Sequence, residues 1–231
     1  LKVLVLERGS PVEHIKDYKG EHKNIWDFKY RNLPDRKLYD EEYPIQQKSY
    51  AFNEATRHFW NYDKKNPYVV NEKKPFDWMR NDVLGGRSLT WGRQVYRFSD
   101  LDFEANKKDN HGTDWPIRYR DIKDWYSYVE KFIGVSGQAE NLPQLPDSEF
   151  LPPMQFTKIE KLVKQRIEEY FDDRMMTIGR TATLTVPHNG RAACHYCGPC
   201  ERGCMTGSYF SSQSSTLPAA FKTNKLTLKT D

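Results

Sequence analysis

The pattern of apolar positions predicts short strands close to both ends of the chain. Val3–Leu6 is an unbroken apolar run that ends at an acid, Glu7, and is typical of a buried strand. Near the other end, Leu226–Lys229 reads LTLK and predicts the beginning of another strand. Residues 181–186 alternate as TATLTV, which predicts a third.

Apolar side chains recur at steps of three and four residues in two stretches, and each stretch predicts an amphipathic helix. The first set is Ile122, Trp125, Val129, Phe132 and Ile133, and the second is Phe156, Ile159, Leu162, Val163, Ile167, Tyr170 and Phe171. Gly134 is suited to end the first helix. A further helix is predicted to begin in residues 215–220, which hold a hydroxyl cap and an early proline. We expect both apolar faces to pack in the core.

Two stretches show no strong periodicity. Residues 10–80 are polar, aromatic and interrupted by prolines, so we expect long excursions with short helices or strands. Their aromatic side chains are expected to pack onto the main body: Trp26, Phe28, Trp60 and Tyr62. Residues 141–153 hold four prolines and predict an extended crossing segment.

Composition narrows the class of protein. The 231 residues suffice for one large domain or two small ones. Hydrophobic residues make up 37% of the chain, which is low, but 14% are aromatic, too many for a disordered chain. The net charge of +4 comes from interspersed charges, which argues against a nucleic-acid partner. No apolar run approaches the roughly 20 residues of a membrane-spanning helix.

A paired-glycine motif is the first candidate for binding chemistry. Residues 81–92 read NDVLGGRSLTWG, and we call residues 84–92 the glycine loop. Without a Cβ, Gly85 and Gly86 let the backbone approach a large ligand closely. Hydroxyl groups and free N–H groups in such a turn favour an anion, and an indole supplies a flat apolar wall. By itself, the motif is more typical of a plain turn than of a ligand site.

Three motifs in this order resemble the glucose–methanol–choline (GMC) family of FAD-dependent oxidoreductases. They are the opening LKVLVLERG, the glycine loop LGGRSLTWG, and residues 114–137, which read DWPIRYRDIKDWYSYVEKFIGVSG. The resemblance covers most of the chain. It implies an α/β fold, with α+β character in the substrate part, built on an incomplete Rossmann-like FAD-binding domain with inserted substrate or cap segments.

The resemblance also implies a division into three parts. Residues 1–105 would form the FAD-binding part, with residues 10–80 as an irregular insert. Residues 106–190 would form helical substrate or cap segments, and residues 191–231 would return to the FAD-binding domain. The GxGxxG turn of dinucleotide folds is absent from these 231 residues. We therefore expect a fragment of a longer protein, with this turn shortly before Leu1.

Site residues follow from the same resemblance. An acid that ends a strand about 20 residues after the glycine-rich turn holds the adenosine ribose, which implies a cofactor role for Glu7, with Arg8 beside it. Without the resemblance, Glu7 reads as an ordinary strand-end acid. Further implied FAD contacts are Gly85, Gly86, Ser88, Thr90, Trp91 and Gly92. Some family members carry a histidine, covalently bound to the flavin, where this chain has Thr90, so noncovalent FAD is expected here.

All four cysteines lie in residues 194–204, which we call the cysteine loop. Cys194, Cys197, Cys200 and Cys204 follow the spacing CxxCxxCxxxC, as in the iron–sulfur motif of bacterial ferredoxins, but without its final proline. An iron–sulfur cluster fits this spacing, and some sugar dehydrogenases of the GMC family carry one on nearby cysteines. Structural zinc, disulfides and unliganded thiols are the alternatives. His14, His22 and His58 lack metal-ligand spacing and are expected to be structural or exposed.

The resemblance implies an enzyme that oxidises a CH–OH group of a sugar, polyol or related alcohol by hydride transfer to the flavin, with a dehydrogenase favoured. The family's catalytic base is a histidine near the far C-terminus, so no catalytic residue is expected within this chain. An external quinone or cytochrome would accept the electrons. A different class of function remains open, namely an iron–sulfur or zinc module for electron transfer without flavin. A non-enzymatic relative with an inactive site is a third possibility. Substrate, oligomeric state and a cytoplasmic or periplasmic location stay undetermined.

Overall fold

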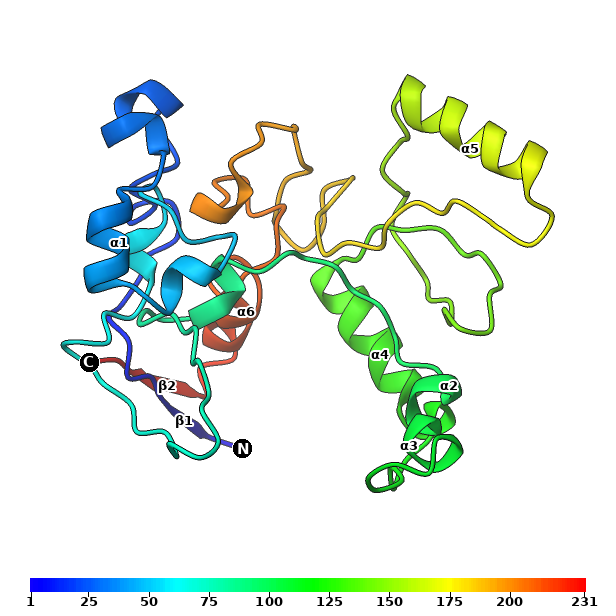
Figure 1. Cartoon of the computed structure of the whole chain (residues 1–231), viewed down its shortest axis with the longest axis horizontal. Coiled ribbons are helices and arrows are strands. Elements are labelled where there is room, and N and C mark those ends of the chain that lie inside the picture. The colour runs from blue at the N-terminus through cyan, green and yellow to red at the C-terminus, as the bar shows by residue number, and fades with distance from the viewer. The chain divides into compact units, whose positions relative to one another are not determined.

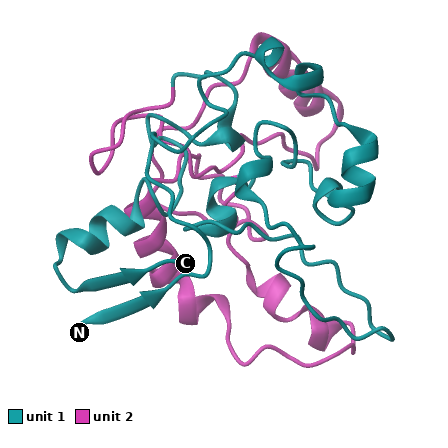
Figure 2. Ribbon diagram, turned by 90° about the vertical axis from the view of Figure 1, so that its left-hand side faces the viewer, with its two compact units in different colours: residues 1–92, 195–231 teal, residues 93–194 magenta.

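A computed structural model describes all 231 residues and divides them into two compact units. Unit 1 comprises Leu1–Gly92 and His195–Asp231, and unit 2 comprises Arg93–Cys194 (Figure 2). Unit 2 is therefore inserted into the sequence of unit 1. The predicted division places its boundaries after residues 105 and 190, whereas the two units divide after residues 92 and 194.

A parallel pair of strands joins the two ends of the chain within unit 1 (Figure 1). Strand β1 is Val3–Leu6 and strand β2 is Leu226–Lys229, both at the predicted positions, and Val3 pairs with Leu226. The expectation that Val3–Leu6 is buried is wrong, because all four of its residues are exposed in this two-stranded sheet. Helix α6, Thr216–Lys222, precedes β2 and confirms the third predicted helix. Its N-cap residue Ser215 makes no side-chain cap bond, contrary to the expected hydroxyl cap. The chain thus mixes helices with a small parallel sheet, which is compatible with an α/β fold.

Residues 10–80 form irregular chain with short helices, as expected. Helix α1 spans Arg36–Glu42, and Asp35 caps it by accepting a hydrogen bond from the N–H of Leu38. The 3₁₀ helices of unit 1 are η1 Ile25–Asp27, η2 Lys29–Asn32, η3 Gln46–Lys48, η4 Arg57–Phe59, η5 Gly86–Leu89 and η6 Cys200–Arg202.

The core of unit 1 is largely aromatic, and it lies between residues 12 and 89. It consists of Val12, Tyr18, Tyr39, Ala51, Phe52, Phe59, Trp60, Val83 and Leu89. Of the four aromatics predicted to pack inward, Phe28 and Trp60 are buried and Tyr62 is half-buried. The prediction is wrong for Trp26, whose side chain in the short helix η1 is 69% exposed. No residue of η1 is buried, so the whole turn lies on the surface and its apolar side chains remain exposed.

Unit 2 is built on helices and extended chain. Its helices are α2 Asp100–Phe103, α3 Ala105–Lys108, α4 Tyr119–Ile133 and α5 Lys158–Tyr170. Helices α4 and α5 confirm the two predicted from periodicity. Gly134 ends α4 with φ 75°, a conformation that suits glycine. At the start of α5, Thr157 and Glu160 form a reciprocal capping box.

The strand predicted for residues 181–186 does not form, and this prediction is wrong. Thr181 makes single bridges, one to Gln94 and one to Ser136, but no continuous ladder follows. Ala182 and Leu184 are nevertheless completely buried. The alternating pattern therefore records an extended, buried segment, whose neighbours on both sides are loops rather than strands.

The apolar face of α5 is exposed, contrary to the expectation of core packing. No residue of this helix is buried, and the side chains of Ile159 and Tyr170 are 76% and 68% exposed. The same expectation fails in part for α4, where Ile133 is buried but Trp125 is 70% exposed. Periodicity shows which side chains share a face, but it does not show what covers that face. None of the helices combines the length and the apolar composition that a membrane crossing requires.

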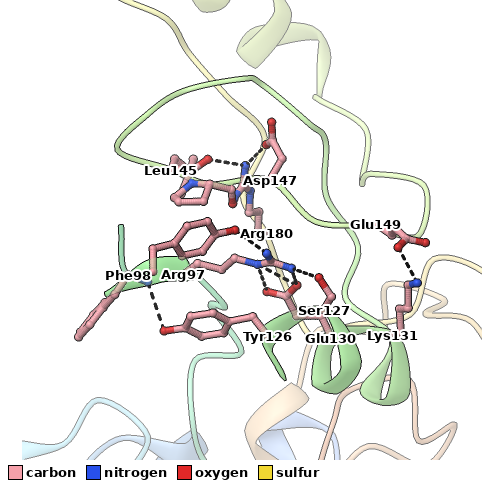
Figure 3. Close-up of polar contacts among 12 residues, drawn as sticks. Arg97, Phe98, Tyr126, Ser127, Glu130, Lys131, Leu145, Asp147, Glu149 and Arg180 are labelled. Atoms are coloured by element: carbon pink, nitrogen blue, oxygen red, sulfur yellow. Dashed lines mark hydrogen bonds and ion pairs between the residues drawn. The ribbon is translucent and has the colours of Figure 1, made fainter. Parts of the chain in front are cut away.

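A buried ion pair links α4 to the segment before α2 in unit 2 (Figure 3). Arg97 and Glu130 are 4% and 3% exposed, and the guanidinium Nη2 lies 2.5 Å from a carboxylate oxygen. Arg97 also donates to the hydroxyls of Tyr119 and Ser127. A second buried guanidinium, that of Arg180, donates to the Asp147 carboxylate and to two carbonyl oxygens. Arg97 thus holds the segment before α2 to α4, and Arg180 holds two extended segments of unit 2 together.

Candidate functional site

The end of β1 lies directly against the segment that leads into the glycine loop. The N–H of Ser10 donates to the carbonyl of Asp82 at 3.2 Å, and the N–H of Leu84 donates to the carbonyl of Ser10 at 2.8 Å. Contact is so close at Gly9 that a Cβ there would lie 2.4 Å from the backbone nitrogen of Val83. A glycine is therefore required for the two segments to meet. The structure thus brings together two motifs that are 75 residues apart in sequence.

The two paired glycines differ in what surrounds them. Both have positive φ, 83° for Gly85 and 50° for Gly86. A Cβ on Gly85 would lie 2.5 Å from the amide of Gln213, whose Nε2 donates to the carbonyl of Leu84. A Cβ on Gly86 would meet no atom within 4 Å. A side chain at position 85 would therefore displace the Gln213 amide from Leu84, while Gly86 leaves open space beside the backbone.

The hydroxyls of the glycine loop are engaged within unit 1. Ser88 Oγ donates to the carbonyl of Gly85 at 2.7 Å and accepts from the N–H of Ser212 at 3.1 Å. Thr90 is completely buried, and its hydroxyl oxygen accepts a hydrogen bond from Asn81 at 3.1 Å. These two side chains hold the loop in shape, and the part of the loop with open space beside it is the backbone at Gly86.

Trp91 and Gly92 complete the loop. The Trp91 indole N–H donates to the carbonyl of Phe210 at 3.1 Å, and the Tyr209 hydroxyl donates to the carbonyl of Trp91 at 2.8 Å. The aromatic rings of Tyr209 and Phe210 pack edge-on against the indole, with their centroids 6.5 and 6.1 Å from it. Gly92 is exposed, and a Cβ there would lie 3.3 Å from the Tyr50 hydroxyl.

Glu7 and Arg8 lie where β1 ends. One carboxylate oxygen of Glu7 accepts a hydrogen bond from the N–H of Gly9 at 2.8 Å, which fixes the turn after the strand. Arg8 is half-exposed and forms an ion pair with Asp82 at 2.6 Å. Arg8 therefore contacts the segment entering the glycine loop, and both side chains are accessible to solvent.

Residues that sequence reasoning missed hold the glycine loop in place. Residues 208–215, which we call the serine segment, contribute Phe210, Ser212 and Gln213 to the contacts just described. Asn81 donates to the carbonyl of Gly86 as well as to Thr90. The sequence SYFSSQSS is unusually rich in hydroxyls, and this was the only signal of a buried polar segment.

The cysteine loop crosses the boundary between the units, because Cys194 is the last residue of unit 2. Cys197 is exposed, whereas the other three cysteines are partly buried, and all four are thiols. Cys204 Sγ lies 3.3 Å from the hydroxyl of Thr206. No three of the chain's histidine, cysteine, aspartate or glutamate side chains are gathered as a metal ion requires.

Within unit 1, the part of the cysteine loop after Cys194 packs on residues 14–28. A Cβ on Gly203 would lie 2.3 Å from Cγ of the buried Tyr18 ring. The guanidinium of Arg202 lies 5.0 Å from the centroid of the Phe28 ring and donates to the carbonyl of Lys23. A cavity of about 560 Å³ opens beside this contact, lined by residues 21–25 and by Cys197, Gly198, Pro199, Glu201 and Arg202.

Three histidines fit the structural or exposed role expected of them. His14 Nδ1 lies 2.8 Å from the hydroxyl of Tyr18, and burial lowers the pKa of His14. Burial also lowers the pKa of His58 to about 4, so this imidazole is neutral at pH 7. His22 is exposed.

Glu21 gives a pH-dependent prediction. Burial raises the pKa of its carboxyl to about 7, because the charged form loses hydration beside the cysteine loop. The folded protein thus holds a proton that the unfolded chain releases above pH 4.5, so stability falls as the pH rises from 4.5 to 7. We expect Glu21→Gln to raise the melting temperature at pH 8 and to leave it nearly unchanged at pH 4.5. An equal shift at both pH values, measured by circular dichroism, would contradict this assignment.

Comparisons with known proteins add no assignment to this geometry. A scan against protein-family models finds no match for the chain, and a search of curated proteins finds no significant relative.

Proposed function

We propose that the chain is part of an FAD-dependent oxidoreductase of the GMC type that oxidises CH–OH groups of a sugar, polyol or related alcohol. One observation carries the proposal. The end of β1, with Glu7 and Arg8, is held against a glycine loop whose Gly86 leaves open space beside its backbone. The resemblance to the GMC family implies that both of these segments contact FAD, and the contact between them supports a shared binding region.

The residues present fit such a cofactor. A Cβ at position 86 would fill the open space, so the glycine keeps a place where a large planar or phosphate-bearing ligand can approach the main chain. Glu7 would accept hydrogen bonds from ribose hydroxyls, and Arg8 would face the anionic part of the cofactor. Trp91, whose indole is fixed by the serine segment, would form a wall beside the cofactor.

When bound, the flavin supplies the hydride acceptor for alcohol oxidation. This chain's own residues bind and orient the cofactor. The hydroxyls of Ser88 and Thr90 and the amides of Asn81 and Gln213 keep the loop rigid, so that binding does not require the loop to become ordered. No residue of the chain is proposed as the base that removes the hydroxyl proton.

The cysteine loop favours a second candidate function, electron transfer through an iron–sulfur cluster, on the strength of its CxxCxxCxxxC spacing. Thiolates are the donors that such a cluster requires, but the sulfurs are not gathered into a metal site in this structure. The spacing of the cysteines in the sequence is therefore what supports this candidate. A module without flavin would account for the cysteines but would leave Gly86 without a role.

The paired glycines provide a matched test of the flavin proposal. We expect Gly86→Ala to weaken FAD binding by about tenfold or more, because the new methyl group occupies the ligand's space, at a cost in stability of about 1–2 kcal/mol from the positive φ alone. Gly85→Ala should instead destabilise the fold, because its methyl group collides with Gln213. The FAD affinity is measured on the intact protein by fluorescence quenching, and the folding by thermal melting. Unchanged FAD affinity in a folded Gly86→Ala protein would contradict the proposal.

A further inference from the structure

Helix α5 presents an apolar stripe that its own unit leaves uncovered. The exposed members are Ile159, Leu162, Val163 and Tyr170, which follow one another at steps of three, one and seven residues and so lie on one face. Thr157 and Glu160 cap the helix, so it is a well-formed element rather than a fraying one. Helices of soluble proteins with such a stripe usually bury it against another element.

One edge of this stripe carries a positive charge at the start of the helix and a negative charge near its end. Lys158 begins the helix and Glu169 lies near its end, eleven residues or about three turns later. Three full turns return to nearly the same angle around the helix axis, so both side chains flank the stripe on the same side. Gln165, which is neutral, lies between them on that edge.

A two-fold axis perpendicular to the helix makes this pattern self-complementary. In an antiparallel pair of α5 helices, the same edge of each helix meets its counterpart, and the start of one helix meets the end of the other. Lys158 then faces Glu169 of the second copy, and the symmetry repeats this pair. Across the two-fold axis, Ile159 near the start of one helix meets Tyr170 at the end of the other. Leu162 meets the apolar stem of Arg166, whose guanidinium is paired with Glu169 of its own helix at 2.9 Å. A parallel pair would bring opposite edges together and would lose this match.

We propose that the exposed face of α5 is a self-association surface, on which a second copy of this chain packs its own α5 in the antiparallel direction. The occupant is a second copy because both the apolar stripe and the charged edge are complementary to themselves. A single pair of helices of this length buries less than the standard protein–protein interface of about 1,600 Å². Association is therefore weak, with a dissociation constant in the high micromolar range.

Sedimentation equilibrium of the full chain, from low micromolar to several hundred micromolar, tests the proposal. The wild-type protein is expected to show a monomer–dimer equilibrium, and Leu162→Glu to remain monomeric, because the new carboxylate would be buried in the interface. Leu162 is exposed in the monomer, so the circular dichroism spectrum of the variant should not change. A wild-type protein that stays monomeric, or a folded Leu162→Glu protein that still dimerises, overturns the proposal.

Charge reversal tests the antiparallel geometry. Lys158→Glu and Glu169→Lys should each raise the dissociation constant about tenfold, since each creates two like-charge pairs by symmetry. An equimolar mixture of these two variants should regain dimerisation, because the heterodimer restores both opposite-charge pairs. The double variant Lys158→Glu/Glu169→Lys should also dimerise as the wild type does. Failure of both the mixture and the double variant to recover overturns the antiparallel pairing, and hence the proposal.

Discussion

Replacing Glu130 by glutamine is expected to lower the free energy of unfolding of unit 2 by about 3–5 kcal/mol. The substitution keeps the shape of the side chain but leaves the Arg97 guanidinium, 4% exposed, without a compensating charge. Two hydroxyl acceptors, on Tyr119 and Ser127, satisfy its N–H groups but not its charge. This loss is a large fraction of the stability of a typical domain, about 5–15 kcal/mol.

The neighbouring residue supplies a matched control. Lys131 follows Glu130 in α4 and pairs with Glu149, but both of these side chains are more than half exposed. Exposed ion pairs contribute about 0–1 kcal/mol, so Lys131→Gln should barely change the stability. Replacing both buried partners, Arg97→Met with Glu130→Leu, should recover much of the loss, because no buried charge then remains. Urea denaturation measures all three, and equal losses for Glu130→Gln and Lys131→Gln would contradict the assignment of Arg97–Glu130 as a buried pair.

Gly203→Ala is expected to destabilise unit 1 by about 3–5 kcal/mol. A Cβ at this position would lie 2.3 Å from the Tyr18 ring, which belongs to the aromatic core and cannot move without opening a cavity there. Gly203 also has a φ of 100°, a backbone conformation that is strained for any residue other than glycine. The contact also fixes the second half of the cysteine loop on residues 14–28. The loss should therefore appear as a lower midpoint in urea denaturation.

Gly198 is the control for this substitution, since it lies in the same loop at the same φ of 100°. A Cβ there would meet no atom within 4 Å, so Gly198→Ala should lose only about 1–2 kcal/mol, from the backbone strain. A Gly203→Ala protein as stable as the Gly198→Ala protein would show that the loop does not pack on Tyr18.

Local sequence patterns predicted the elements but not their surroundings. The ranges of β1 and β2 and the end of α4 at Gly134 follow from apolar runs and from the conformational freedom of glycine, which depend on near neighbours in the chain. The strand prediction for residues 181–186 fails because an alternating pattern indicates only that every second side chain is buried, and loops can bury these side chains as well as strands can. The expectation that α5 packs in the core fails because an apolar stripe does not identify the element that covers it.

The candidate site was predictable only in its main motifs. Glycine pairs and a strand-end acid can be read from neighbouring letters, whereas the hydrogen bond from Gln213 to Leu84 joins residues 129 positions apart. The burial of Thr90 and the engagement of Ser88 by Ser212 are likewise tertiary effects. A hydroxyl beside a glycine pair looks the same in sequence whether it binds a ligand or supports the loop.

The most direct test of the flavin proposal is the absorption spectrum of the intact protein, purified without oxygen, with iron and sulfide assayed on the same sample. The proposal predicts flavin bands and a stoichiometric amount of FAD that is released into solution on acid denaturation, since Thr90 cannot form a covalent flavin bond. Stoichiometric iron and sulfide in addition would support a cluster on the cysteine loop. A protein without flavin, and above all one with iron but no flavin, would contradict the proposal and favour the metal-binding module.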